Sequence, residues 1–480
     1  MGASRIEERP ASFLATKRGK LTLGVLCMVA FLDFVDNSIT TVALPSIGRH
    51  LHFSVQNLQW VVSGYFLTYG GLMLLGGRAA DLLGRRRVLV AGTAVFGLAS
   101  MGAGLAGSTG VLVTARLCQG CGAAMMTPAA LSILTTSFRT GTDRTRALGA
   151  WGAAGGLAAA VGVIAGGVLS EGPGWRWIFF VNVPVCALLV PAILALIPGE
   201  RRSAPRATFD SVGAVLVTGG MLLLTYGLVQ APTVGWGTVR TVGCLAGAGF
   251  VLAAFVLNES RHANPLVPLG IFRIGGLAAA DATQVLAQSG IFTMFFFTTL
   301  FMQVVLDFSQ IQTGFAYLPV AIGVAVGAGI SSQLFPRYGT RPLIVTGALL
   351  VSTTLLWISR ITVHSTYLSS LLAPFVIFAV GVGFVFVGVQ TAATAGVPSD
   401  TAGLAAALVT ASLQVGGALG LAILSAVATA RTHRLLGAHV SPAVALTGGF
   451  RAGLVGAAAF VLAAAVIATR AADTHAAPGP

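Results

Sequence analysis

Fourteen runs of about twenty mostly apolar residues dominate this chain and decide what it can fold into. A helix of that length crosses the hydrocarbon layer of a bilayer, and it satisfies its own backbone hydrogen bonds within lipid. Only 9% of the residues are charged, against about 25% in soluble domains, which excludes a water-facing globular protein. The runs occupy residues 21–45, 57–78, 88–107, 110–136, 147–169, 177–197, 211–230, 240–257, 275–304, 312–335, 342–359, 367–389, 402–429 and 452–469. We therefore predict an all-α integral membrane protein with fourteen transmembrane helices.

The basic residues indicate how the chain is oriented in the membrane. An even number of spans places both termini on one side, and Lys and Arg are enriched in cytoplasmic loops. Of the 28 Lys and Arg residues, 20 fall in the tails and in the loops on that side, 7 fall in the opposite loops, and Arg116 lies inside a span. We therefore expect both termini in the cytoplasm. Because this asymmetry accounts for the net charge of +14, we expect no nucleic-acid partner.

A weak internal repeat relates the two halves of the chain. The segments GRRRVLVAG (84–92) and GTRPLIVTG (339–347) share a glycine, an arginine and a second glycine at a constant offset of 255. Parallel repeats of six spans are one plan on which secondary transporters are built. The predicted units are a cytoplasmic tail (1–20), a six-helix bundle (21–200), two additional spans (201–271), a second six-helix bundle (272–470) and a cytoplasmic tail (471–480).

Five stretches resemble motifs of one transporter family. They are VDNSITTVALP (35–45), GGRAADLLGRRRV (76–88), RLCQGCGAA (116–124), WRWIFFVNVP (175–184) and GLAAALVTASLQVGGALG (403–420). The chain is thus similar to the fourteen-span drug:proton antiporters of the major facilitator superfamily, a group rich in antibiotic exporters of actinomycetes. The resemblance implies the major facilitator fold, two six-helix bundles plus two extra helices, in a bacterial cell membrane. It also implies a monomer that needs no cofactor, metal or ATPase subunit.

The stretch at 76–88 resembles the superfamily signature between the second and third spans. The matching residues are Gly77, Asp81, Gly84, Arg85 and Arg86. In the family this loop locks one transport state by pairing with nearby helix ends, so the resemblance implies a conformational gate. A plain positive-inside anchor would account for the arginines, but not for Asp81 and the glycines.

The fifth span departs from the family pattern at one position. The antiporter motif reads Gly-Pro-x-x-Gly-Gly, whereas here Val163 stands where proline is expected. The three glycines, Gly162, Gly166 and Gly167, are kept, and small residues allow helices to pack closely. We therefore expect close packing here, without the bend that a proline would give the helix.

The first span carries two aspartates, although an aspartate at the centre of a membrane helix costs about 2.5–3.5 kcal/mol on insertion scales. Asp33 and Asp36 form one polar stripe with Asn37 and Thr40, at i, i+3, i+4 and i+7. Burial and a neighbouring carboxylate both disfavour ionisation, so the pair should bind and release a proton near neutral pH. We expect proton coupling here, with Asp36 also matching the acidic family position. The alternative is a helix anchor.

Arg116 is the one basic residue well inside a predicted span, and a buried guanidinium requires an acceptor. We expect it to pair with Asp36, or alternatively with backbone carbonyls of a packed helix. Asp281 lies in the ninth span and offers a second proton or cation site, or else a hydrated residue near the cytoplasmic mouth. Candidates to line the substrate path are Asn37, Thr40, Gln119, Gln284, Gln288 and Gln414.

Signatures of enzymes are absent from the sequence or misplaced in it. The chain contains no G-x-x-x-x-G-K-[ST], H-E-x-x-H or G-x-S-x-G motif, and GAGLAG (102–107) lies inside an apolar run with no preceding strand. We therefore predict a proton-coupled exporter of small amphipathic drugs or antibiotics, and not an enzyme. A proton-coupled exporter of a dedicated metabolite, such as a siderophore or an amino acid, is the first alternative. A non-transporting membrane sensor is the second.

Overall fold

The structure is a computed structural model that describes residues 13–138, 141–199, 210–262, 265–274, 276–394 and 402–473. Every regular element in these ranges is helical. The long helices of the first half are α1 (Lys17–His50), α3 (Trp60–Leu83), α4 (Arg85–Gly104), α5 (Thr109–Ser137), α6 (Gly141–Leu169) and α8 (Asn182–Leu196). An additional pair follows, α9 (Ser211–Val234) and α10 (Val239–Arg261). Those of the second half are α11 (Leu277–Leu300), α13 (Leu318–Tyr338), α14 (Thr340–Ile358), α16 (Leu372–Thr394), α17 (Ala402–Gly437) and α18 (Pro442–Ala468).

Short helices extend or connect the long ones. They are η1 (Phe13–Ala15), α2 (Val55–Leu58), η2 (Ser170–Gly174), α7 (Trp177–Phe180), η3 (Leu269–Arg273), η4 (Phe301–Val305), α12 (Gln310–Ala316) and α15 (Tyr367–Ser370). Thirteen membrane-length helices in the described residues are apolar enough to cross a bilayer by length and composition. The remaining long helix, α3, has 24 residues, and its serine, tyrosines, threonine and glycines lower its hydropathy. The helices therefore follow the predicted order of fourteen spans.

Several predicted boundaries are wrong because helices continue beyond the apolar runs. The runs at 402–429 and 452–469 belong to α17 and α18, which leave only a short connection between Gly437 and Pro442. His433, which follows the run at 402–429, therefore lies in α17. Likewise α10 extends beyond the run at 240–257 to Arg261 and includes Glu259, which is 3% exposed. Hydropathy does not detect these ends because polar residues continue a helix without adding to an apolar run.

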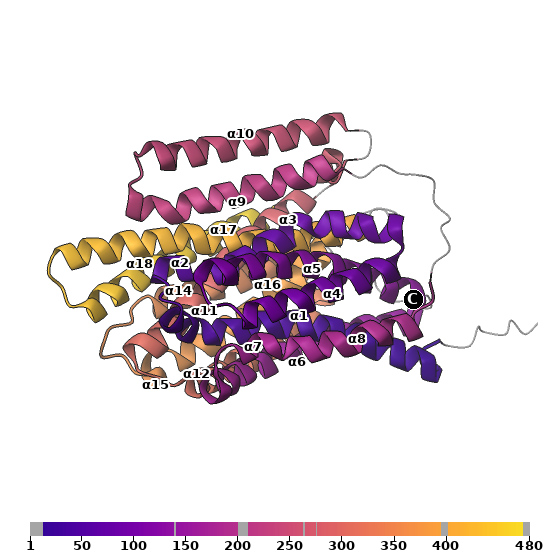
Figure 1. Ribbon diagram of the computed structural model, residues 1–480, viewed down its shortest axis with the longest axis horizontal. Helices are drawn as coiled ribbons and strands as arrows, with labels where there is room; N and C mark the ends of the chain where they lie inside the picture. Colours follow the sequence, from indigo (N-terminus) through magenta and orange to yellow (C-terminus); the bar gives the residue numbers. More distant parts are fainter. Residues whose placement is uncertain are drawn as a thin grey trace, which may run out of the picture.

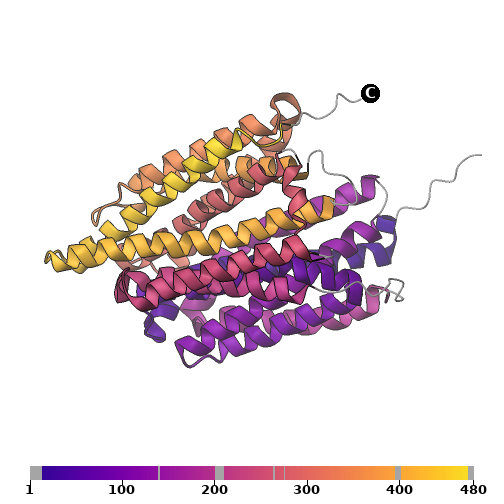
Figure 2. The ribbon, with the colours of Figure 1, turned by 90° about the horizontal axis from the view of Figure 1, so that it is seen from above.

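The helices gather into two groups with the additional pair at one edge. In the first group α1 packs on α6, and α3 and α4 pack on α5; in the second, α11 packs on α17 and α18, and α14 on α16 and α18. Figure 2 shows the indigo-to-purple first half on one side and the orange-to-yellow second half on the other. Helices α9 and α10 pack on each other, and α9 also packs on α3 and α17 (Figure 1). The arrangement is that of two bundles plus a pair, while the exact unit boundaries stay predictions.

The sequence repeat is also a structural repeat at its glycines. Gly84 joins α3 to α4 with φ +97°, and Gly339 joins α13 to α14 with φ +82°. Residues with a side chain rarely adopt this backbone conformation, whereas glycine adopts it at no steric cost. A Cβ on Gly92 would lie 2.7 Å from a backbone nitrogen of α5, and a Cβ on Gly347 would lie 2.7 Å from a carbonyl oxygen of α16. In both halves the third helix thus packs closely on the fourth.

The repeated arginines make equivalent contacts. Arg86 at the start of α4 donates to the Ile197 carbonyl oxygen just after α8, at 3.1 Å. Arg341 at the start of α14 donates to the Ala471 carbonyl oxygen just after α18, at 3.0 Å. The last carbonyls of a helix lack partners within it, so each arginine ties the beginning of the third helix to the end of the sixth.

Candidate functional site

A buried polar network surrounds Asp36 in the first half. Its Oδ2 accepts a hydrogen bond from Arg116 Nη1 at 2.5 Å, and the two side chains are 0% and 1% exposed. Its Oδ1 accepts from the amides of Gln119 and Asn182, each at 2.8 Å. Gln119 Nε2 also donates to Ser100 Oγ at 2.8 Å. Helices α1, α4, α5 and α8 each contribute at least one group, so both oxygens of the carboxylate are satisfied and its charge is balanced.

Both partners that we considered for Arg116 are present at once. Besides the contact with Asp36, Arg116 Nε donates to the Val61 carbonyl oxygen of α3 at 2.8 Å. Its Nη1 donates to Gln119 Oε1 at 2.8 Å, and its guanidinium lies 4.4 Å from the centre of the Tyr65 ring. The predicted pairing with Asp36 is therefore confirmed as geometry, and a backbone carbonyl shares the same cation.

Asp33 is buried in a different environment one turn away. Its Oδ1 accepts from the Tyr65 hydroxyl at 2.5 Å and its Oδ2 from the Tyr69 hydroxyl at 2.8 Å. Thr127 contacts the same Oδ2 at 3.5 Å. In the described part of the chain no Lys or Arg forms an ion pair with Asp33. The two carboxylates of the stripe thus differ, since one faces a cation and the other faces only hydroxyl groups.

The other members of the stripe are also on the inner side of α1. Thr40 is 0% exposed and Asn37 is half-buried. Asn37 Nδ2 donates to the Asp33 carbonyl oxygen at 2.9 Å. Within the described residues, Asn37 Oδ1 and Thr40 Oγ1 are buried with no hydrogen-bond partner. Such groups cost free energy unless a ligand or a moving side chain satisfies them, which keeps both as candidates to line a path.

A second buried polar cluster lies in the second half. Asp281 in α11 is 7% exposed, and its Oδ1 accepts from Ser412 Oγ of α17 at 3.2 Å. Gln284 is 2% exposed and Gln414 of α17 is 5% exposed, whereas Gln288 is half-buried. Among described atoms, Asp281 Oδ2 and the side-chain oxygens of Gln284 and Gln414 have no hydrogen-bond partner. This cluster is separate from the Asp36 network, and it is incompletely satisfied.

The proposed gate occupies a helix junction, not a loop. Asp81 belongs to the last turn of α3, and Gly84 alone separates α3 from α4; the Asp81 side chain lies outside the described part. Arg85 begins α4. A Cβ on Gly77 would lie 3.7 Å from its nearest neighbour, an ordinary contact, whereas a Cβ on Gly76 would lie 2.0 Å from a carbonyl oxygen of α5. The close approach therefore belongs to Gly76, which sequence reasoning did not select.

The fifth-span glycines lie in close helix contacts, as expected from their size. A Cβ on Gly162 would lie 2.6 Å from Ser38 Cβ, and one on Gly166 would lie 2.8 Å from the Ile39 carbonyl oxygen, so α6 packs tightly on α1. A Cβ on Gly167 would instead lie 2.7 Å from the Gln310 carbonyl oxygen of α12. Gly167 thus contacts the other half of the molecule.

This contact between the halves lies at the helix ends away from the chain termini. A Cβ on Gly314 of α12 would lie 2.4 Å from the carbonyl oxygen of Val163, the residue that replaces the family's proline. Nearby, Glu171 Oε2 accepts from the Ile311 backbone amide at 3.1 Å. Gln303 Nε2 donates across the halves to a carbonyl oxygen of α1 at 2.9 Å. At this end, α6 and α1 of the first half therefore pack directly on the second.

Four residues of the network escaped sequence reasoning. Tyr65 and Tyr69 stand one turn apart in α3, and Ser100 and Asn182 each stand between apolar neighbours in their helices. Asn182 carried a detectable signal, because an amide within an apolar span needs partners. The serine and the tyrosines carried none, since such residues occur throughout membrane helices without a common role.

Comparison with known proteins decides the family. The profile of the Major Facilitator Superfamily matches residues 26–421. The chain belongs to the Major Facilitator Superfamily. As a member of this transporter superfamily it is a multi-pass membrane transporter and not an enzyme, and the fold expected from the motifs is confirmed.

Relatives within the superfamily are similar over nearly the whole chain. The puromycin resistance protein pur8 of Streptomyces alboniger is 38% identical over 453 residues, which cover 93% of this chain and 90% of that protein. The cephamycin export protein CmcT of Amycolatopsis lactamdurans is 39% identical over 455 residues, covering 94% and 92%. The similarity is therefore not confined to the quoted motifs.

Solved structures of major facilitator proteins share the fold. The crystal structure of an auto-inhibited peptide transporter of the POT family superposes with a TM-score of 0.68 at 15% identity, covering 97% of this chain and 99% of that one. A bacterial homologue of the human lysosomal transporter Spinster, in an inward-facing and unoccupied conformation, gives 0.66 at 17% identity, covering 95% and 97%. At such identities the likeness concerns architecture alone.

Proposed function

We propose that this major facilitator protein exports small amphipathic drugs or antibiotics and thereby confers resistance. Support comes from the relatives already described, whose names state puromycin resistance and cephamycin export. A third relative, the tetracenomycin C resistance and export protein of Streptomyces glaucescens, is 35% identical over 430 residues. These compounds differ from one another, so we propose the class of substrate and not one molecule.

We further propose that export is driven by protons through the carboxylates of α1. The observation that supports proton coupling is the contrast between the two buried carboxylates. Asp36 faces the Arg116 guanidinium, whereas Asp33 faces two tyrosine hydroxyls. A buried charge without a counter-ion is costly, so proton uptake by Asp33 relieves an uncompensated charge. Proton uptake by Asp36 would instead leave Arg116 without its counter-ion.

The contrast suggests an order of events. In the proposed cycle the coupling proton binds first at Asp33, because the Arg116 guanidinium lies against Asp36. Protonation of Asp36 requires the contact with Arg116 to open, and that contact joins α1 to α5. A proton that reaches Asp36 therefore biases the packing of these helices, which is how ligand binding shifts a two-state equilibrium. Tyr65 links the sites, since it contacts both Asp33 and the guanidinium.

Other features of the proposal concern sidedness and gating. We propose that both termini are cytoplasmic and that the protein acts as a monomer. The proposed gate, at the helix ends nearest the chain termini, consists of Gly77, Asp81, Gly84, Arg85 and Arg86. The Asp281 cluster is the proposed second proton or cation site. With this orientation, the contact of α6 with α12 closes the external side.

Transport in proteoliposomes tests the proposal. The purified chain is reconstituted with a proton gradient, and uptake of puromycin is compared with and without collapse of the gradient. We expect gradient-dependent uptake in wild type and its loss in Asp33→Asn and Asp36→Asn. Uptake that is unaffected by the gradient would contradict proton coupling.

The substrate class is tested separately in cells. A host that lacks its own efflux pumps and expresses this chain should tolerate raised concentrations of several antibiotics. If the host's tolerance does not change and the chain exports a single siderophore or amino acid, the dedicated metabolite exporter is favoured instead.

A further inference from the structure

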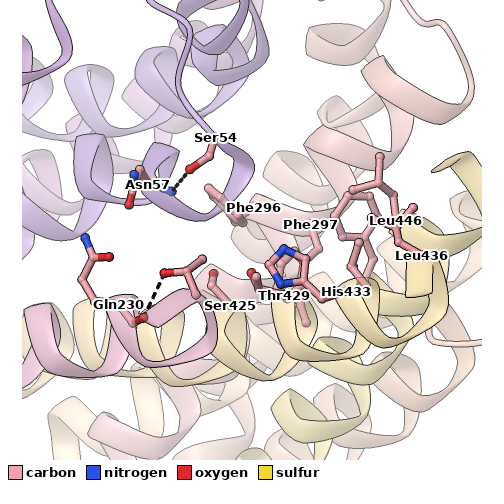
Figure 3. A pocket seen from close by; sticks show the side chains of 14 residues that line it. Ser54, Asn57, Gln230, Phe296, Phe297, Ser425, Thr429, His433, Leu436 and Leu446 are labelled. Atoms are coloured by element: carbon pink, nitrogen blue, oxygen red, sulfur yellow. Dashed lines mark hydrogen bonds between the residues drawn. The ribbon is translucent and has the colours of Figure 1, made fainter. Parts of the chain in front are cut away.

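A cavity of about 310 Å³ lies where the first half, the additional pair and the second half meet. Its lining comes from α2 with the residue before it, from α9, α11, α17 and α18, as Figure 3 shows. Helix α9 contributes Gln230 and Thr233 near its end at Val234. The cavity therefore lies at the helix ends away from the termini, which is the external side in the proposed orientation.

This cavity is distinct from the carboxylate network of α1. It is also distinct from the Asp281 cluster, since Ser425 in its lining follows Gln414 by eleven residues in α17, about 16 Å along the helix axis. None of the residues that surround Asp33 and Asp36 is among those that line the cavity. A volume near the lower end of ligand pockets, about 300–1,000 Å³, is sufficient for one small molecule.

One wall of the cavity is aromatic. Phe296, Phe297 and Phe450 line it, and the rings of Phe297 and Phe450 are stacked with their centroids 5.5 Å apart. These residues come from α11 and α18, which pack on each other. Such a wall favours binding of a flat aromatic group, because aromatic rings prefer stacked or edge contacts with one another.

The facing wall is polar but carries no acidic group. Thr429 and His433 of α17 lie along it with Ser425 (Figure 3), and Gln230 and Thr233 of α9 add an amide and a hydroxyl. Among the described residues that line the cavity there is no Asp or Glu. Hydroxyl, amide and imidazole groups both donate and accept hydrogen bonds, so this wall suits an uncharged polar group better than a cation.

Ser425 provides an independent observation that points to a ligand. It is 2% exposed, and within the described chain its Oγ has no hydrogen-bond partner. Buried hydroxyl groups in proteins are almost always bonded. Figure 3 shows this side chain at the polar wall, facing the space between α2 and α17.

We propose that this cavity is a second, external binding site for uncharged aromatic molecules that carry hydroxyl or amide groups. This proposal rests on the proposed export function. The cavity would receive an exported compound at the outer end of the compound's path. Helix α9 completes the polar wall, which gives the additional pair of helices a role in selecting what leaves the transporter. A permanent cation would form no ion pair with this polar wall, because the wall offers no carboxylate.

Protection of an introduced cysteine tests occupancy of the cavity directly. The full chain with Thr429→Cys is purified in detergent and alkylated with N-ethylmaleimide. The reaction is read by mass spectrometry on peptides of α17, which contains no natural cysteine. Chloramphenicol, an uncharged aromatic amide with hydroxyl groups, should slow alkylation about fivefold at four times its dissociation constant. Ethidium, a permanent cation, should not slow it.

Matched variants separate occupancy from indirect effects. Arg431→Cys lies two residues further along α17, is exposed and does not line the cavity, so chloramphenicol should leave its alkylation unchanged. Ser425→Leu fills the cavity and should abolish the protection of Thr429→Cys. Gln230→Leu should raise the half-protecting concentration about fivefold, through loss of one hydrogen bond.

Several results would overturn the proposal. They are an absence of protection by chloramphenicol, equal protection of Arg431→Cys, and protection that survives Ser425→Leu. None of these measurements requires a proton gradient. Failure of export is detected in proteoliposomes with the wild-type chain, so it is distinguishable from failure of this site.

Discussion

Replacing Arg116 with methionine should destabilise the protein through one identifiable group, the Asp36 carboxylate. Methionine keeps an unbranched apolar stem, while the guanidinium that contacts Asp36, Val61 and Gln119 is lost. Both members of the ion pair are essentially unexposed, so water cannot replace the missing cation. Breaking a buried pair by removing one partner costs about 3–5 kcal/mol, and we expect the free energy of unfolding to fall by that amount.

The partner variant and the double variant give this prediction its control. Asp36→Asn leaves a buried guanidinium without its counter-ion and should cost a similar amount. The double variant Arg116→Met/Asp36→Asn removes both charges, and replacement of a whole buried pair is often neutral. It should therefore be more stable than either single variant by at least about 2 kcal/mol, which is a strong coupling for two residues in contact.

The assay is reversible chemical unfolding in detergent, followed by tryptophan fluorescence, at two pH values. Lowering the pH should reduce the deficit of Arg116→Met, because proton uptake by Asp36 removes the uncompensated charge. Arg434→Met, an exposed arginine of α17, should change stability by less than about 0.5 kcal/mol. Additive losses in the double variant, with no effect of pH, would refute the reasoning and leave Arg116 as a packing residue.

Three further predictions address coupling, the contact between the halves, and topology. Asp33→Asn should abolish gradient-driven uptake yet keep substrate exchange without a gradient, because only proton binding is removed; loss of both activities would assign Asp33 to substrate binding. Gly167→Val should separate α6 from α12, since a Cβ there would lie 2.7 Å from a carbonyl oxygen. A cross-link between these helices should then form more slowly than in Gly152→Val, where nothing lies within 4 Å. A cysteine near Val234 should react with an impermeant reagent outside intact cells, whereas one near Arg470 should not; the reverse would invert the orientation.

The number and order of the helices could be predicted from apolar runs alone. Lipid offers no hydrogen bonds, so a run of sufficient length must form a helix wherever it is placed. Helix ends were predicted less well: the runs at 57–78 and 312–335 stop before α3 and α13 end at Leu83 and Tyr338. Where polar residues continue a helix into water, as at the end of α17, hydropathy contains no information about the end.

The partnership of Asp36 with Arg116 was also predictable, because charges within apolar spans are rare and costly and must find each other. The roles of Tyr65, Tyr69 and Ser100 were not. Neutral polar groups are tolerated at many places in a bundle, so their partners depend on how each helix is rotated about its axis. That rotation is set by packing between helices that are distant in sequence.

The sequence by itself determined the class of protein, its helices and the rare intramembrane charges, because each of these follows from the cost of placing given groups in lipid. Tertiary structure alone decided that Asp33 faces two tyrosines, although it lies one turn from Asp36 and its predicted cation. It also decided that α9, α11, α17 and α18 enclose a cavity between aromatic and polar walls. Contacts of this kind depend on the relative positions of whole helices, and no local pattern of residues encodes those positions.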